Sequence, residues 1–101
     1  MFIGKIVGSV VATQKTESMR GSKLMMIEPY VIEPKTRDRL ITTSRSLVAV
    51  DLVGAGEGQF VLVVQGSSAR MTPETKSLPV DCTIIGIIDS ITIQHEQLPL
   101  Y

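Results

Sequence analysis

The sequence predicts an all-β fold, a small closed barrel of about five to six strands with at most one short helix. Hydrophobic residues make up 44% of the 101 residues and aromatic residues only 4%. Burial therefore rests on isoleucine, valine, leucine and methionine, and the many β-branched side chains favour strands. The apolar stretches are short and separated by turns that contain glycine or proline, and no segment has the periodicity of an amphipathic helix. Closing such a sheet into a barrel removes its exposed edges.

The chain length indicates one domain over residues 1–101, with a tail from about residue 94. A domain of this size buries only about two thirds of the surface that its unfolded chain exposes. The mean hydropathy is nevertheless positive. We therefore expect apolar side chains to remain uncovered in a single copy, and oligomerisation is the simplest way to cover them.

Charge and cysteine content exclude several function classes. Ten basic and ten acidic residues give a formal net charge of zero, so the positive surface typical of nucleic-acid-binding proteins is not expected. The single Cys82 excludes an intrachain disulfide and a cysteine-cluster zinc site, and it fits a reducing compartment. The N-terminal segment lacks the pattern of a secretory signal, and no apolar run approaches the roughly 18 residues of a membrane span. We therefore expect a cytoplasmic protein without a membrane, metal or cofactor partner.

The first strand is expected over residues 2–12, where apolar side chains occupy both alternating faces and indicate cover on two sides. Gly4 and Gly8 are placed on one face of this strand, where missing side chains permit curvature or close packing. After a polar loop, a second strand is expected over residues 23–28. It should end there because Pro29 limits regular pairing.

The middle of the chain predicts two further strands. Residues 33–46 are polar and rich in arginine, which indicates a long loop or an irregular edge hairpin. Strands are expected over residues 47–53 and 60–64, and the glycine-rich residues 54–58 form the turn between them.

The last third of the chain predicts one more strand after a helical turn. Residues 67–71 are expected to form that turn, with a serine cap, and residues 72–79 a polar loop bounded by prolines. The last strand is expected over residues 82–94, with a bend at Gly86 and a turn or bulge at residues 89–90.

Catalytic chemistry has no support in the sequence. The glycine-rich turn at residues 54–58 resembles a phosphate-binding loop, but a strand follows it instead of the helix whose N-terminus would hold the anion. The serines, the aspartates and His95 lack the spacing of a hydrolytic triad. Aspartates near strand ends are instead expected to accept backbone hydrogen bonds in turns: Asp51, Asp81 and Asp89. We therefore predict no catalytic residue and no enzyme.

Two short motifs rich in small residues flank the apolar stretch at residues 60–64. They consist of Asp51, Gly54, Ala55 and Gly56, and of Gly66, Ser67, Ser68, Ala69 and Arg70. Glycine serves where φ is positive or where another backbone comes close, and short side chains allow the same approach. We interpret the two motifs as a subunit-packing site. Arg70 is then either a solvated charge or a guanidinium paired with an aspartate across the barrel or across a subunit boundary.

Several motifs follow one another in order from about residue 2 to residue 89: GKIVGSVVAT from position 4, KLMM from 23, VAVD from 48, GAG from 54, GSSAR from 66, VD from 80 and IIGIID from 84. Together they resemble the EutN/CcmL family, the vertex proteins of bacterial microcompartment shells. The chain departs from the family at Gln59, where glutamate is common, and over residues 34–46, where the loop is rich in arginine.

The resemblance implies a β-barrel related to the OB fold, assembled into a homopentamer that caps the vertices of a shell whose facets are hexameric proteins. It implies that the two small-residue motifs lie toward the subunit interfaces and the central axis. The protein would then be a structural component of a microcompartment shell in the cytoplasm. Its tail, from Leu98 to Tyr101, is expected to lie across a neighbouring subunit. The resemblance does not specify the enclosed reactions, passage through the centre of the ring or the facet proteins that the ring contacts.

A second function class remains open, an OB-like module that binds single-stranded nucleic acid. Such modules use a basic groove with stacking aromatic side chains. The chain has only two tyrosines and two phenylalanines. Tyr30, with Lys35, Arg37 and Arg39 nearby in sequence, is the local patch that would serve this function.

Overall fold

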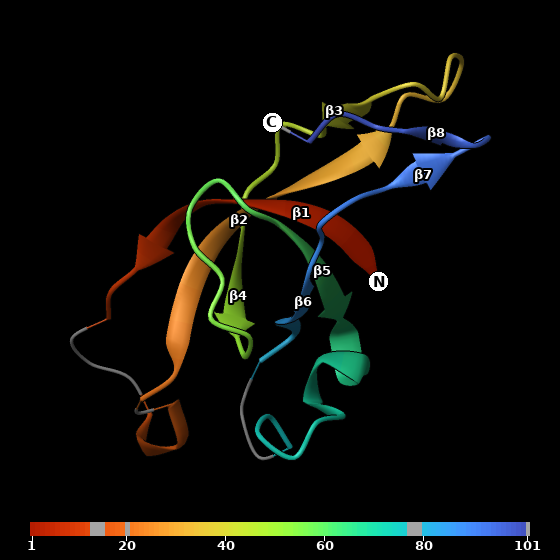
Figure 1. Ribbon diagram of the computed structural model, residues 1–101. Coiled ribbons are helices and arrows are strands. Elements are labelled where there is room, and N and C mark those ends of the chain that lie inside the picture. The colour runs from red at the N-terminus through yellow and green to blue at the C-terminus, as the bar shows by residue number, and fades with distance from the viewer. Residues whose placement is uncertain (13–15, 20, 77–79, 101) are drawn as a thin grey trace.

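A computed structural model of the chain describes residues 1–12, 16–19, 21–76 and 80–100, and it shows a closed β-barrel from which an arm projects (Figure 1). Five strands form the barrel: β1 (Phe2–Val10), β2 (Lys23–Ile32), β4 (Leu47–Asp51), β5 (Phe60–Gln65) and β6 (Cys82–Ile87). They are hydrogen-bonded in the order β1-β5-β6-β4-β2, and pairing of β1 with β2 closes the barrel. Only the pairing of β4 with β6 is parallel among these described ladders. The predicted all-β barrel is confirmed.

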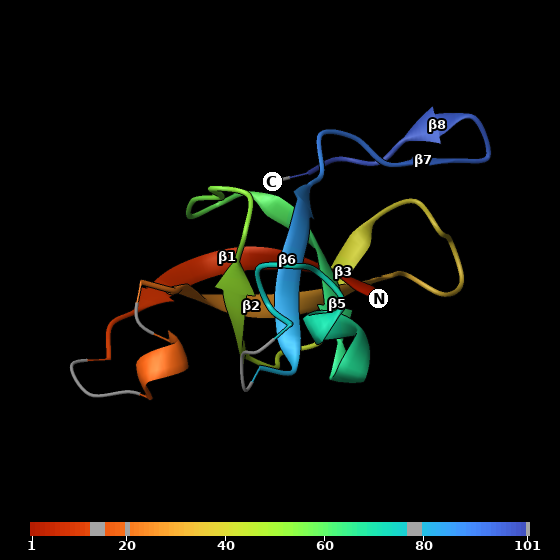
Figure 2. The same ribbon diagram turned by 90° about the horizontal axis from the view of Figure 1, so that it is seen from below.

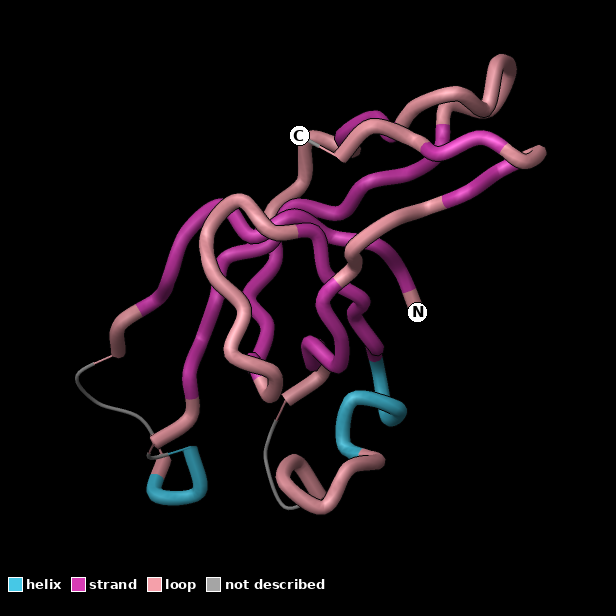
Figure 3. Tube along the Cα trace, viewed as in Figure 1, coloured by secondary structure: helices cyan, strands magenta, loops and turns pink. Residues whose placement is uncertain are grey.

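The arm consists of the end of β2, residues 33–42 and residues 88–100. The end of β2 pairs with β3 (Leu40–Thr42), and β7 (Thr92–Ile93) pairs with β8 (Glu96–Gln97) in a separate hairpin. Figures 1 and 2 show these segments projecting together beyond one end of the barrel, and Figure 3 shows that they are mostly loop with short pieces of strand. The molecule is therefore elongated, with extents of 46 × 24 × 20 Å.

The structure has two apolar cores, one inside the barrel and one outside its wall. The inner core is formed by Ile6, Met25, Ile27, Ala49, Ala55, Val61, Val63, Cys82 and Ile84. The outer core is formed by Leu40, Phe60 and Leu98, with partly buried side chains from β1, β2 and residues 88–100 packed against them. The rings of Tyr30 and Phe60 meet edge to face there, with centroids 5.2 Å apart. The prediction of a first strand covered on two sides is confirmed at its start, because Ile6 packs in the inner core and Ile3 against the outer one.

The prediction that Gly4 and Gly8 share a face is wrong, because β1 contains a bulge. The register with β2 shifts between Ile6 and Gly8, so the residues after the shift change sides. Gly4 is buried in the barrel wall, where a Cβ would lie 3.6 Å from a methyl group of Val63. Gly8 instead pairs with Met26, which lies between two inward-facing neighbours on β2 and therefore faces outward.

The prediction that the second strand ends before Pro29 is also wrong, since β2 continues to Ile32. The amide nitrogen and carbonyl of one residue point to the same side of a strand. The carbonyl of Pro29 accepts hydrogen bonds from the backbone N–H of Thr43 at 3.1 Å and from its hydroxyl at 2.9 Å, so the nitrogen of Pro29 faces away from β1. The proline therefore removes no hydrogen bond from the β1 ladder, and it lies where β4 has left β2 and β3 begins.

The expected strand over residues 82–94 is divided into two parts. β6 ends at Ile87, and the chain reverses at Gln94 and His95 to form the β7–β8 hairpin. Both residues have positive φ, 52° and 69°, as a two-residue type I′ hairpin loop requires. Neither is a glycine or asparagine, so the local sequence contains no signal for this turn.

The expected helical turn at residues 67–71 is found as the 3-10 segment η2 (Gly66–Arg70), and a second 3-10 segment, η1 (Glu17–Met19), lies in the first polar loop. Parts of the loops expected over residues 13–22 and 72–79 lie outside the described residues. Within the described part of the chain, no helix is long and apolar enough to cross a membrane.

The edge segment expected over residues 33–46 is confirmed, and Glu33 organises its first turn. One carboxylate oxygen of Glu33 accepts hydrogen bonds from the backbone N–H groups of Lys35 (3.0 Å) and Thr36 (2.6 Å) and from the Thr36 hydroxyl (2.7 Å). These bonds, chiefly the one from the Thr36 backbone, hold the pKa of Glu33 below its ordinary value of 4.5. The same hydroxyl of Thr36 and the guanidinium of Arg39 lower the pKa of Asp38.

Acidification is expected to loosen this turn. Because the folded pKa of Glu33 is depressed, its contribution to loop order is present above the ordinary value of 4.5 and is lost as the pH falls through the folded pKa. An NMR titration in an Asp38→Asn background should show Glu33 titrating below 4.5 together with the Thr36 amide signal. Glu33→Gln keeps an acceptor oxygen and should make that signal independent of pH. A Glu33 pKa at or above 4.5 would contradict this account.

Candidate functional site

The two predicted small-residue motifs lie at opposite ends of β5. Gly54, Ala55 and Gly56 belong to the turn before this strand, and Gly66–Arg70 form η2 directly after it. A six-residue strand spans about 20 Å, and Figure 1 shows the turn and η2 on different sides of the barrel. The structure therefore does not join the motifs into one site within a subunit. They are two separate surfaces.

Asp51 organises the first motif. Its side chain is buried, and its two carboxylate oxygens accept hydrogen bonds from the backbone N–H of Val53 (3.0 Å) and of Ala55 (2.9 Å). The expectation that a strand-end aspartate accepts backbone hydrogen bonds in a turn is confirmed for this residue. β4 ends at Asp51, two residues earlier than predicted, because the carboxylate turns the chain there.

Sequence reasoning missed Lys23, the partner of Asp51. The Lys23 ammonium lies 3.4 Å from the Asp51 carboxylate and donates a hydrogen bond of 3.0 Å to the carbonyl of Ala55. Lys23 begins β2 and pairs with Asp51 in register across β4. The two residues lie far apart in the sequence, so only the register of the strands could reveal the pair.

The glycines of the turn have different roles. Gly54 has φ of +76°, a conformation that an L side chain adopts only with strain. Gly56 does not have such a φ, and a Cβ added there would meet no atom within 4 Å. Its backbone N–H donates to the side-chain oxygen of Gln59 at 2.8 Å, so the substitution of glutamine for the usual glutamate retains an acceptor. Nothing within the described part of the subunit requires glycine at position 56.

The second motif is fixed to the start of β6. Gly66 has φ of +70°, and its N–H donates to the carbonyl of Asp81 at 2.8 Å. Ala69 is fully buried, and its carbonyl accepts a hydrogen bond of 2.7 Å from the hydroxyl of Thr83. Ser67 is exposed, and the side chain of Ser68 lies outside what the structure describes.

Arg70 does not pair with an aspartate in the described part of the subunit. Its guanidinium donates a hydrogen bond of 2.9 Å to the carbonyl of Val80, and the residue is exposed. One hydrogen bond uses one of the five N–H donors of a guanidinium. No second partner of this guanidinium is found within the described part of the subunit.

Cys82 is a buried thiol, and among the described residues it is not part of a metal-binding cluster. Cys82 is buried in the inner core, and burial, with a smaller contribution from Asp81, raises the pKa of its thiol. A raised pKa disfavours the reactive thiolate, so Cys82 acts as a small apolar side chain. In the described ranges no three histidine, cysteine or acidic residues cluster in a way that could hold a metal.

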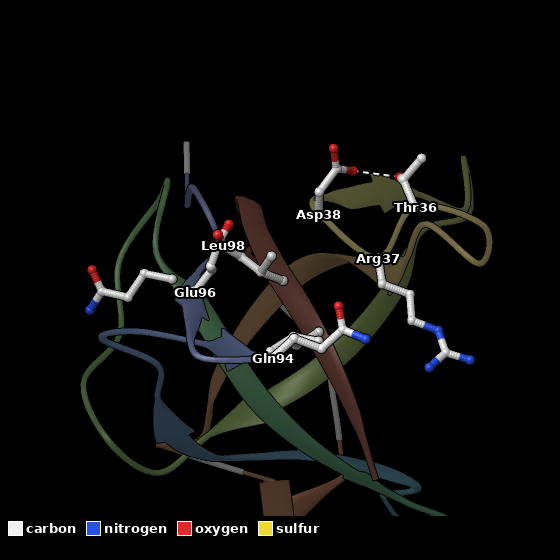
Figure 4. A pocket seen from close by; sticks show the side chains of 8 residues that line it. Thr36, Arg37, Asp38, Gln94, Glu96 and Leu98 are labelled. Atoms are coloured by element: carbon white, nitrogen blue, oxygen red, sulfur yellow. Dashed lines mark hydrogen bonds between the residues drawn. The ribbon is translucent and has the colours of Figure 1, made fainter.

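A polar cavity of about 190 Å³ lies in the arm, between residues 36–38 and the β7–β8 hairpin. Figure 4 shows Thr36, Arg37 and Asp38 on one side of it and Gln94, Glu96 and Leu98 on the other. The acids and the arginine give the cavity mixed charge.

Tyr30 does not present the exposed aromatic face that the alternative nucleic-acid function would need. Tyr30 packs edge-on against Phe60 in the outer core, and the ammonium of Lys5 lies 5.6 Å from the centre of the Phe60 ring. Arg39 is paired with Asp38 at 3.2 Å. Stacking of bases needs an open aromatic face beside cations, and Tyr30 does not offer that face because it packs against Phe60 in the outer core.

The tail also differs from the expectation. Leu98 is 7% exposed, packs in the outer core of its own subunit, and its N–H donates to the carbonyl of Ile91 at 2.8 Å. Leu98 therefore does not extend to a neighbour. Tyr101, which belongs to the same expected contact with a neighbouring subunit, is outside the described residues.

Comparisons with known proteins agree with this geometry. The family model described as ethanolamine utilisation protein EutN/carboxysome matches residues 1–89. The shell vertex protein GrpN of Rhodospirillum rubrum is 37% identical over 91 residues, which cover 90% of this chain and 96% of the relative. The carboxysome shell vertex protein CcmL of Synechocystis is 36% identical over 98 residues, covering 97% of this chain and 92% of the relative.

Solved structures of relatives share the fold. CcmL of Nostoc superposes with a TM-score of 0.84 at 36% identity and covers 96% of both chains. The pentameric microcompartment shell protein GrpN of Rhodospirillum rubrum superposes with a TM-score of 0.75 at 36% identity, covering 92% of this chain and 98% of GrpN. The match in sequence and in structure extends over nearly the whole chain, so the protein belongs to the EutN/CcmL family of bacterial microcompartment shell vertex proteins.

Proposed function

We propose that five copies of this chain form a ring that closes the vertices of a bacterial microcompartment shell, and that the protein acts by its shape and not by catalysis. The observation that carries this proposal is the likeness, over nearly the full chain, to vertex proteins that include a pentameric one. The shell encloses its contents in the cytoplasm, and hexameric facet proteins adjoin the ring.

The two small-residue motifs are proposed to lie at the contacts between subunits. A cyclic ring uses heterologous contacts, in which two different patches of each subunit meet. Two surfaces at opposite ends of β5 fit this requirement. A Cβ at Gly56 would meet no atom of its own subunit within 4 Å, and among the described residues the exposed guanidinium of Arg70 bonds only to the carbonyl of Val80. Both observations support a role between subunits.

Native mass spectrometry tests the assembly. A single chain has a mass of 11.0 kDa, and we expect a species of five times that mass to dominate. Gly56→Leu should give the mass of a single chain, since a Cβ at this position meets no atom of its own subunit within 4 Å and the added bulk is expected to clash with the neighbour. Gly56→Ala, which adds one methyl group, serves as the control and should remain pentameric. Arg70→Ala should also break the ring, whereas Arg45→Ala, at another exposed arginine, should not.

The outcomes separate the parts of the proposal. A wild-type chain that is monomeric under mild conditions would contradict the vertex function. A pentameric wild type, with Gly56→Leu and Arg70→Ala equally pentameric, would leave the function in place and show that these residues are not at the interface. Circular dichroism of each variant checks that the barrel is folded.

A further inference from the structure

The outer wall of the barrel carries apolar side chains toward both of its ends, with the charged residues Lys5 and Glu28 in register between them, and the chain covers only one of these apolar regions. Near the arm, residues 88–100 cover Ile3, Tyr30 and Phe60 and complete the outer core. Toward the other end of the same sheet, Val7 and Val48 are 43% and 45% exposed. Val7 lies on β1 and Val48 on β4, and each of these strands is already hydrogen-bonded to another strand on both sides.

The uncovered side chains form a continuous surface. Val48 pairs in register with Met26 across β4 and β2, and Met26 pairs with Gly8, the residue after Val7, across β2 and β1. Partners in register lie on the same face of a sheet. Beside Val48 the wall is hollowed by a cavity of about 220 Å³, lined largely by aliphatic side chains that include Leu24, Val50 and Val80. We call Val7, Met26 and Val48, with this hollow, the open wall.

The arm has an uncovered apolar pair of its own. Val31 on β2 pairs in register with Ile41 on β3. Their sequence neighbours Ile32 and Leu40 pack in the outer core, so alternation along the strands places Val31 and Ile41 on the opposite face of the arm. Val31 is 49% exposed and Ile41 is half-buried. We call these two residues the arm pair.

The surface of the single chain is larger than that of a closed monomer. The chain exposes 6367 Å², whereas a compact monomer of this mass exposes about 5,600 Å². Its radius of gyration is 14.3 Å, compared with about 12.7 Å for a compact domain of this length. An elongated subunit with excess surface is what is expected of a chain that buries part of its surface against another molecule.

We propose that the arm pair of one copy packs on the open wall of the next copy around the ring, an inference that rests on the proposed pentamer. Two arguments favour a second copy as the occupant. Both surfaces present uncovered aliphatic side chains, so each can bury the other, and the charged residues Lys5, Glu28 and Glu57 lie at the border of the open wall. Figures 1 and 2 both place the arm at one end of the molecule and the end of β1 and the start of β2 at the other. Contact between opposite ends repeats head to tail, which is the pattern of a heterologous ring.

A pair of charge substitutions tests this contact. Val48→Glu blocks the open wall and leaves the arm intact, and Val31→Glu blocks the arm and leaves the wall intact. Both positions are about half exposed, so the subunit itself tolerates the change. In native mass spectrometry each variant alone is expected to give the mass of a single chain instead of the wild-type pentamer. Gln97→Glu places the same charge on a different, exposed part of the arm and should leave the pentamer unchanged.

Mixing the two variants gives the decisive result. The intact arm of Val48→Glu can still pack on the intact wall of Val31→Glu, but the contact cannot be repeated. The mixture is therefore expected to form a one-to-one heterodimer with twice the mass of a single chain, which neither variant forms alone. A variant that loses cooperative unfolding is replaced by its lysine counterpart, whose apolar stem still covers the sheet while its charge blocks the contact.

Each outcome has one meaning. If the wild type is pentameric and both variants remain pentameric, the arm and the wall are not at the interface and the inference is overturned while the vertex function stands. If both variants dissociate but the mixture gives no heterodimer, the two surfaces do not contact each other and the inference is also overturned. A monomeric wild type would instead contradict the proposed function.

Discussion

Asp51→Ala is expected to lower the free energy of unfolding by about 3 kcal/mol, because hydrogen bonds to a charged group contribute about 1.5–3 kcal/mol each and this carboxylate accepts two. Loss of the acceptor should cost more at the N–H of Ala55 than at that of Val53, since Ala55 is only 1% exposed. Denaturant unfolding, followed by circular dichroism at equal protein concentration, measures the loss. Equal concentration is required because assembly adds to the apparent stability.

Two control variants separate the hydrogen bonds of Asp51 from its ion pair. Asp51→Asn keeps one acceptor oxygen and should lose less stability than the alanine variant. Lys23→Met removes the ammonium, whose side chain is 53% exposed, from a carboxylate that is buried. It should cost less than the alanine variant, because both backbone hydrogen bonds of Asp51 remain. A loss in Asp51→Ala no larger than in Lys23→Met would show that the carboxylate does not organise the turn.

Ile84→Ala is expected to lower the free energy of unfolding by about 2–5 kcal/mol, since truncation of a buried isoleucine removes apolar contacts and leaves a cavity. Ile84 is fully buried in the inner core, and its strand β6 joins β5 on one side to β4 on the other. Small domains have only about 5–15 kcal/mol of stability, so this variant should approach the limit of folding. The loss should appear as a lower denaturant midpoint with an unchanged slope.

A graded series checks that this loss comes from the cavity. Ile84→Val removes one methylene and should cost about 0.5–1.5 kcal/mol. Val11→Ala, at a residue that is 88% exposed, should change the stability by less than about 0.5 kcal/mol. If Ile84→Ala cost no more than Val11→Ala, the inner core would not be the main source of stability.

The sequence is sufficient where the determining contacts are short in range. β-branched apolar stretches with glycine-containing turns predict the strands β1, β4 and β5 and the barrel class. The hydrogen bonds from Asp51 to the backbone of Val53 and Ala55 are local, and the small residues before and after β5 are visible as motifs. The ordered motifs also point to the family. These features depend on residues that are neighbours in the chain, so a linear pattern records them.

The tertiary structure decides which faces and which distant residues come together. The bulge in β1 moves Gly8 to the outside, and the gap between β4 and β3 allows β2 to continue through Pro29. The register of β2 with β4 pairs Lys23 with Asp51. A strand with apolar side chains on both faces does not specify which face is inside, and register is fixed by non-local pairing. For that reason the sequence predicts that apolar surface remains uncovered, but only the fold shows that it lies on the arm and on the open wall.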